Sequence, residues 1–113
     1  MNIQIFGQSK SFDTKKAERW FKERGVKFQS VDLVRYGLSR GELDSVLRAV
    51  GGVDALVDPK AKGAESLRYL AYEADKIEKL YEEPSLLRAP IVRNGKRATV
   101  GYCPEVWDGW TKE

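Results

Sequence analysis

The sequence has no histidine and a single cysteine, Cys103, among 113 residues. Without histidine the chain cannot use Ser-His-Asp or Cys-His catalysis, histidine metal ligation or a histidine pH switch. One cysteine cannot form an intramolecular disulfide, which excludes a secreted scaffold held together by disulfides. Because zinc is usually held by histidine and cysteine, we expect no metal site.

Long apolar runs are also missing. No stretch approaches the roughly 18 apolar residues that cross a bilayer, and the N-terminus lacks the apolar core of a signal peptide. We therefore expect a cytoplasmic protein with no membrane partner. The net charge of +3 is mildly basic and does not by itself indicate nucleic-acid binding. A chain of 113 residues is expected to form one domain, residues 1–113, with a core that needs no disulfides.

The N-terminal third has the pattern of a β-α-β unit. Apolar residues Ala17, Trp20 and Phe21 have helical spacing, and Gly25 suits the end of that helix. The predicted elements are a strand over residues 2–6, a helix over residues 13–24 and a strand over residues 26–33. Strands joined through a helix should be parallel, with a right-handed crossover.

The rest of the chain predicts further helices and a hairpin. Ser39 and Glu42 have the spacing of a capping box, and Asn94-Gly95 is a strong hairpin turn. The predicted elements are a helix from Ser39 to residue 50, a loop over residues 57–63, a helix over residues 64–82, strands over residues 90–93 and 97–100, and a helix opening at Pro104. The order β-α-β-α-α-β-β-α predicts an α/β fold with helices on a small, mixed, four-stranded sheet.

The long predicted helix and the aromatic residues complete the expected core. The residues of that helix expected to face the core are Leu67, Leu70, Ala71, Ala74, Ile77 and Leu80. We interpret Tyr69, Tyr72, Trp107 and Trp110 as core and edge packing rather than a stacking platform for nucleic acid, so no direct nucleic-acid partner is expected.

The stretch "FGQSKSFDTKKAERWF" (residues 6–21) leads from a strand through a polar loop into a helix. Ser11 suits the N-terminal cap of that helix, and Asp13 could share this role. Lys10, Lys15 and Lys16 surround the helix start, where unpaired N–H groups favour anions. They could hold an anion or form a solvated face, and both interpretations stay open.

Four segments carry a family resemblance: "IFGQSKSFDTKKAERWFKERGVKFQSVDL", "GLSRGELDSVLRAVGG", "EEPSLLRAPIVRNGK" and "VGYCPEVW". In order and spacing they resemble the arsenate reductase and Spx family, over residues 2–107. The resemblance implies a thioredoxin-like fold with a helical insertion. It also implies that Pro90 follows a cis peptide bond and faces the loop that contains Ser11.

The resemblance places the family's catalytic cysteine at Ser11 and the second cysteine of Spx-type regulators at Thr14. A helix N-terminus lowers the pKa of a cysteine, but serine without a base is a poor nucleophile. The family's arsenate reductases hold the oxyanion with arginines, where this chain has Lys60 and, one residue early, Arg88. The expected anion or glutathione contacts are Lys10, Phe12, Asp13, Thr14, Lys15, Lys60, Arg88 and Pro90.

Two functions follow as hypotheses. The first is a non-catalytic member that binds a small anion or a protein partner: glutaredoxin, thioredoxin or, for an Spx-type regulator, RNA polymerase. The second is a thiol oxidoreductase or arsenate reductase, with glutathione or thioredoxin as reductant, whose cysteine at position 11 was replaced by Ser11. Apart from glutathione as a co-substrate, no cofactor is expected. Cys103 could be a reactive thiol or a half-buried structural residue.

Overall fold

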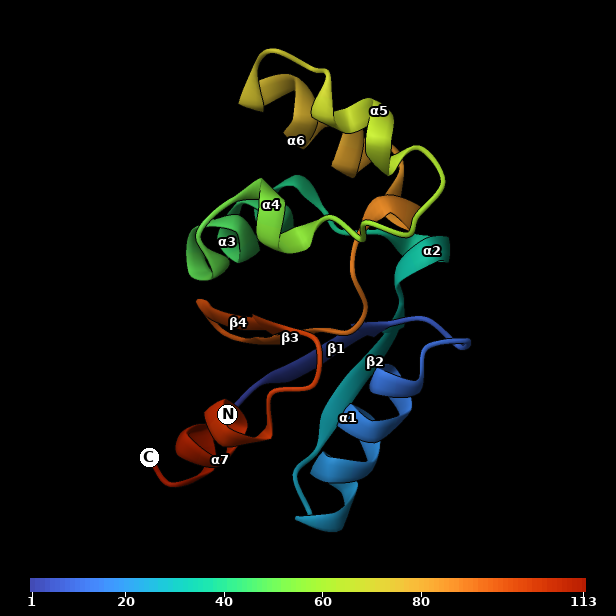
Figure 1. Ribbon diagram of the computed structural model, residues 1–113. Coiled ribbons are helices and arrows are strands. Elements are labelled where there is room, and N and C mark those ends of the chain that lie inside the picture. The colour runs from blue at the N-terminus through green and yellow to red at the C-terminus, as the bar shows by residue number, and fades with distance from the viewer.

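The computed structural model describes residues 1–113 and is built on one four-stranded sheet of order β2-β1-β3-β4 (Figure 1). The strands are β1 (Ile3–Gly7), β2 (Phe28–Asp32), β3 (Ile91–Asn94) and β4 (Arg97–Val100). β1 pairs in parallel with β2 and antiparallel with β3, and β3 pairs antiparallel with β4 across the Asn94-Gly95 turn. The mixed four-stranded sheet is therefore confirmed.

Helices cover both faces of the sheet, as Figure 1 shows. On one face lie α1 (Phe12–Glu23) and α7 (Pro104–Thr111). On the other lies an insertion of α3 (Arg40–Val50), α4 (Val53–Leu56), α5 (Ala64–Arg68) and α6 (Glu73–Glu82). The short helix α2 (Leu33–Tyr36) follows β2, and a 3-10 turn, η1 (Pro84–Leu86), follows α6.

The core is divided by the sheet into two clusters. Ile3 and Ile5 of β1 pack with Trp20, Phe21 and the tryptophans of α7, whereas Phe6 belongs to the larger cluster beneath the insertion. This division follows from the alternation of side chains along a strand. Trp107 and Trp110 are buried as predicted.

The predicted single helix over residues 64–82 is wrong. The chain forms α5 and α6 with a break at residues 69–72, and Tyr69 and Tyr72 are 81% and 72% exposed. Ala71 and Ala74 are also exposed rather than core-facing. Leu67 and Leu80 both enter the cluster beneath the insertion, and packing both into that cluster has overridden the continuous helical pattern.

Smaller differences concern short elements. The second strand is shorter than predicted, since residues 26 and 27 precede it and residue 33 opens α2. The short helices α2 and α4 lie where no helix was predicted, because four residues carry too little periodicity to be recognised. The capping box of Ser39 and Glu42 is present as predicted. No helix is both long enough and apolar enough to cross a membrane.

Candidate functional site

The site predicted at Ser11 lies where β1 ends and α1 begins, at the right-hand edge of Figure 1. Ser11 is the N-cap of α1: its Oγ accepts a hydrogen bond from the backbone N–H of Thr14 at 3.1 Å. Its own N–H donates to the carbonyl of Gln8 at 3.0 Å. The predicted cap is thus confirmed, and the hydroxyl already satisfies one helix N–H.

Thr14, the second hydroxyl residue at the start of α1, is buried beneath this loop. It is only 6% exposed, and its Oγ1 accepts a hydrogen bond from the backbone N–H of Gln8 at 3.3 Å. Both hydroxyls therefore shape the loop: Ser11 ties it to the helix, and Thr14 ties it to the end of β1. No local sequence pattern predicted this role of Thr14.

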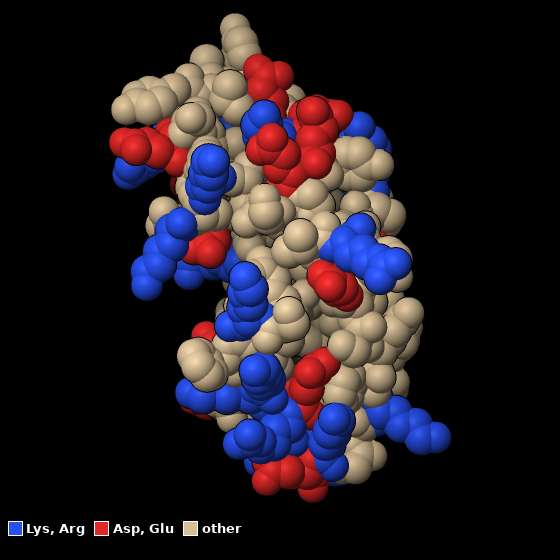
Figure 2. All heavy atoms as spheres, turned by 90° about the vertical axis from the view of Figure 1, so that its right-hand side faces the viewer, with Lys and Arg blue, Asp and Glu red and all other residues tan.

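An exposed aromatic residue with nearby lysines lies beside the cap. Phe12 is 79% exposed, and the Lys15 Nζ lies 6.0 Å from its ring centroid. The next residue, Lys16, has its Nζ 5.9 Å from the ring centroid of Tyr102, which is 41% exposed. In the space-filling view, Lys and Arg side chains crowd the lower end of the face over α1 (Figure 2). This surface, defined by Phe12, Lys15, Lys16 and Tyr102, is called here the α1 surface.

Pro90 lies at the same end of the sheet. The Ala89–Pro90 peptide bond is cis, and Pro90 is buried. It immediately precedes Ile91, which pairs with Phe6, so the antiparallel register puts Pro90 opposite Gly7 at the end of β1. The Pro90 carbonyl accepts a hydrogen bond from the N–H of Gly101 at 2.9 Å, which brings the segment after β4 to this edge as well.

The only cysteine is part of that segment. Cys103 is partly buried, and its thiol donates to the carbonyl of Val100 at 3.3 Å. Burial raises the pKa of the Cys103 thiol, the charges of Glu105 and Asp13 raise it further, and Thr99 acts in the opposite direction. A raised pKa favours the protonated thiol over the thiolate, which is the reactive form. The sequence did not reveal that Asp13 acts on Cys103.

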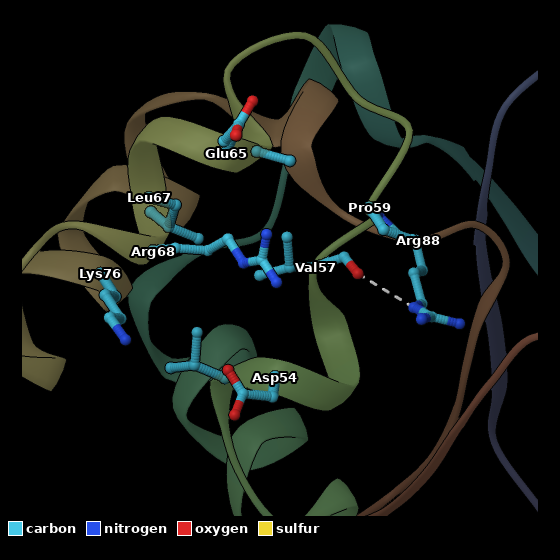
Figure 3. A pocket seen from close by; sticks show the side chains of 10 residues that line it. Asp54, Val57, Pro59, Glu65, Leu67, Arg68, Lys76 and Arg88 are labelled. Atoms are coloured by element: carbon cyan, nitrogen blue, oxygen red, sulfur yellow. Dashed lines mark hydrogen bonds between the residues drawn. The ribbon is translucent and has the colours of Figure 1, made fainter.

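Arg88 and Lys60 belong to the insertion side of the molecule. Arg88 donates its backbone N–H to the carbonyl of Leu56 at 2.7 Å and its Nε to the carbonyl of Val57 at 3.0 Å (Figure 3). The backbone N–H of Lys60 donates to Asp58 Oδ1, and its side chain is exposed. Neither Arg88 nor Lys60 forms a hydrogen bond with Ser11.

No group of three or more histidine, cysteine, aspartate or glutamate side chains is placed to hold a metal ion. An open hollow of about 300 Å³ lies beside the loop between β1 and α1, and Ser11 is not among the residues that line it. Its lining is largely polar: Gly7, Gln8, Ser9, Thr14, Lys15, Glu18, Ser30, Val31 and Asp32. These groups can offer hydrogen bonds and charge to a bound molecule.

Together, the mixed sheet, the helix that opens after β1 and the cis-proline opposite the end of β1 define a thioredoxin-like protein with a helical insertion. More specifically, the chain belongs to the ArsC family, whose model matches residues 6–109. The resemblance to arsenate reductases and Spx proteins is confirmed.

Curated relatives and solved structures agree with this assignment. The global transcriptional regulator Spx 2 of Oceanobacillus iheyensis is 34% identical over 106 residues, covering 90% of this chain and 78% of the relative. Spx of Bacillus subtilis is 31% identical over 105 residues, covering 88% and 79%. A putative ArsC family related protein from Bacteroides fragilis superposes with a TM-score of 0.83 at 19% identity, over 96% of this chain and 97% of the other. Arsenate reductase from Vibrio cholerae gives 0.82 at 21% identity, over 94% of each chain. At such identities the two structures show a shared fold.

Proposed function

We propose that this chain is a non-catalytic ArsC-family regulator of transcription that acts by binding RNA polymerase. The observation that carries the proposal is the state of position 11: a serine whose hydroxyl accepts the cap hydrogen bond from Thr14. No histidine is available to activate it, and the raised pKa of Cys103 disfavours the thiolate of the only cysteine. The relatives at 34% and 31% identity carry the name of global transcriptional regulators.

The α1 surface supports a protein partner. Exposed aromatic side chains next to cations are typical of interface centres, since they combine apolar area with charge recognition. Phe12 is 79% exposed and belongs to neither core cluster, so its ring is available to a partner. A regulator of this kind works in the cytoplasm, as the sequence predicts.

Binding to purified RNA polymerase from the source organism tests the proposal. We expect a stable complex with the natural chain, and about a tenfold weaker one with Phe12→Ser, as for loss of an interface anchor. Tyr69→Ser is the matched control, because Tyr69 is equally exposed but lies in the break between α5 and α6. If Tyr69→Ser weakens the complex instead, the interface lies on the insertion. If no complex forms, the proposed function is wrong.

The second hypothesis, a reductase that lost its cysteine, is favoured by one observation: the side chain at position 11 points to a helix N-terminus. We expect no arsenate reduction by the natural chain with either glutathione or thioredoxin as reductant. Turnover by the natural chain in a coupled NADPH assay would contradict this. Turnover gained by Ser11→Cys, together with a cysteine codon at this position in the genome, would establish the reductase instead.

A further inference from the structure

The helical insertion contains a pocket of about 430 Å³ that is separate from Ser11, between α4, α5 and α6 (Figure 3). Its apolar lining comes from Val53, Val57, Ala64 and Leu67. Three of these, Val53, Ala64 and Leu67, are about 5% exposed or less, so they form a fixed floor rather than mobile surface residues.

The wall nearest η1 is held rigidly. Residues 56–58 and 86–88 face each other through the Val57–Leu87 bridge, and two backbone hydrogen bonds close it: Arg88 N–H to Leu56 at 2.7 Å and Asp58 N–H to Leu86 at 2.8 Å. A wall fixed by main-chain hydrogen bonds keeps its shape without a ligand, and such preformed pockets lose little entropy on binding.

Charges of both signs converge over this floor without pairing. Figure 3 shows the side chains of Arg68, Lys76 and Asp54 around the same hollow, whereas Glu65 lies at the rim and Arg88 points away. None of the five ion pairs of the molecule involves these residues. The guanidinium of Arg68 and the ammonium of Lys76 are free for a carboxylate, and the Asp54 carboxylate is free for an ammonium group.

We propose that this pocket binds a small zwitterion with an apolar side chain: a hydrophobic amino acid or a short peptide made of such residues. Its carboxylate lies on Arg68 and Lys76, its ammonium group on Asp54, and its side chain on the floor at Val53 and Leu67. A purely anionic ligand meets the uncompensated charge of Asp54, and a purely cationic one meets two positive charges. A ligand that carries both charges can pair with both kinds of group.

A second hollow, of about 320 Å³, adjoins the pocket and shares Val53, Asp54 and Lys76 with it. It leads from the pocket to the Gly51-Gly52 turn at the end of α3. A ligand longer than one residue has room to continue there, so a free amino acid and a peptide share the chemistry but differ in length.

The test is an amide-shift titration of the full chain with L-leucine and with the dipeptide Leu-Leu. We expect saturable shifts at residues 53–57, 64–68 and 76 with at least one of them. Tighter binding of L-leucine would indicate a free amino acid as the ligand, and tighter binding of Leu-Leu would indicate a peptide. N-acetyl-leucine lacks the ammonium group, and leucinamide lacks the carboxylate. Each should bind about tenfold more weakly than leucine, as for loss of a charge-assisted hydrogen bond.

Variants separate the pocket from general surface charge. Arg68→Gln and Asp54→Asn should each weaken binding about tenfold. Arg48→Gln, on the exposed face of α3 and outside the pocket, should leave binding unchanged. The proposal is overturned if millimolar leucine and Leu-Leu shift no pocket amide, if N-acetyl-leucine binds as well as leucine, or if the Arg48 variant weakens binding as much as the Arg68 variant. This result is independent of RNA polymerase binding.

Discussion

Gly7 and Thr14 are in such close contact that no side chain fits between them: a Cβ built on Gly7 would lie 2.9 Å from Thr14 Oγ1 and closer still to its methyl carbon. The contact joins the last residue of β1 to the first turn of α1. It lets Thr14 reach back to the N–H of Gln8 and close the loop that Ser11 caps. The loop geometry thus depends on a glycine at position 7.

Gly7→Ala should therefore destabilise the protein by about 1–3 kcal/mol, as expected for an overpacked core position. Urea unfolding followed by circular dichroism measures the change. Gly109→Ala is the matched control: nothing lies within 4 Å of its added Cβ, and it is in helix α7. Alanine there should stabilise by about 0.5–1 kcal/mol. Equal effects of both substitutions would contradict the Gly7–Thr14 contact.

Ser11→Ala should cost about 1 kcal/mol in the free energy of unfolding, because the N–H of Thr14 loses its cap. Ser9→Ala is the control, since the exposed Ser9 side chain forms no hydrogen bond within the chain. A cost for Ser9→Ala as large as that for Ser11→Ala would mean that the loop, and not the cap, matters.

Ser11→Cys, made together with Cys103→Ser, should give a thiol whose pKa lies below the free-cysteine value of about 8.5. The helix N-terminus stabilises the thiolate that the serine hydroxyl cannot form. The rate of iodoacetamide alkylation against pH measures the pKa, with Ser9→Cys as a loop thiol for comparison. A pKa equal to that of the Ser9→Cys thiol would refute the inferred site geometry.

A buried hydrogen bond joins Trp107 of α7 to Thr99 of β4 on the sheet face that α1 and α7 cover. Trp107 Nε1 donates to Thr99 Oγ1 at 2.8 Å, and Trp107 is completely buried. Thr99→Val leaves the indole N–H without an acceptor and should cost about 1–3 kcal/mol. Trp107→Phe in the same background removes the donor, so a double-mutant cycle should show that the two losses are not additive. Additive losses would mean that this hydrogen bond contributes nothing.

The raised pKa of Cys103 predicts that the protein loses stability at alkaline pH. The folded pKa of the Cys103 thiol is raised above its ordinary value, so at alkaline pH the folded chain keeps the proton that the unfolded chain releases. The stabilisation is present below the unfolded pKa and is lost as the pH rises through the folded pKa. Urea midpoints from about pH 8 to about pH 10 should fall more steeply for the natural chain than for Cys103→Ser. Parallel curves would contradict the raised pKa.

Much of the architecture could be predicted from local patterns. The strand–loop–helix at residues 6–21, the capping box at Ser39 and the Asn94-Gly95 hairpin depend on neighbours a few residues apart, and all are present. Ser11 as the cap of α1 also follows from local chemistry. The absence of histidine and the single cysteine already exclude histidine-dependent catalysis and an intramolecular disulfide.

Only the tertiary structure decided features that join distant segments. The helical pattern over residues 64–82 is continuous, yet burying both Leu67 and Leu80 beneath the insertion breaks it and exposes Tyr69 and Tyr72. Asp13 affects the pKa of Cys103 only because the fold brings two distant segments together. The same holds for the grouping of Arg68, Lys76 and Asp54 over one apolar floor, which no local sequence pattern encodes. Local hydrogen bonding and periodicity fix an element's type, whereas burial of apolar surface shared by several elements fixes where it ends and which charges it brings together.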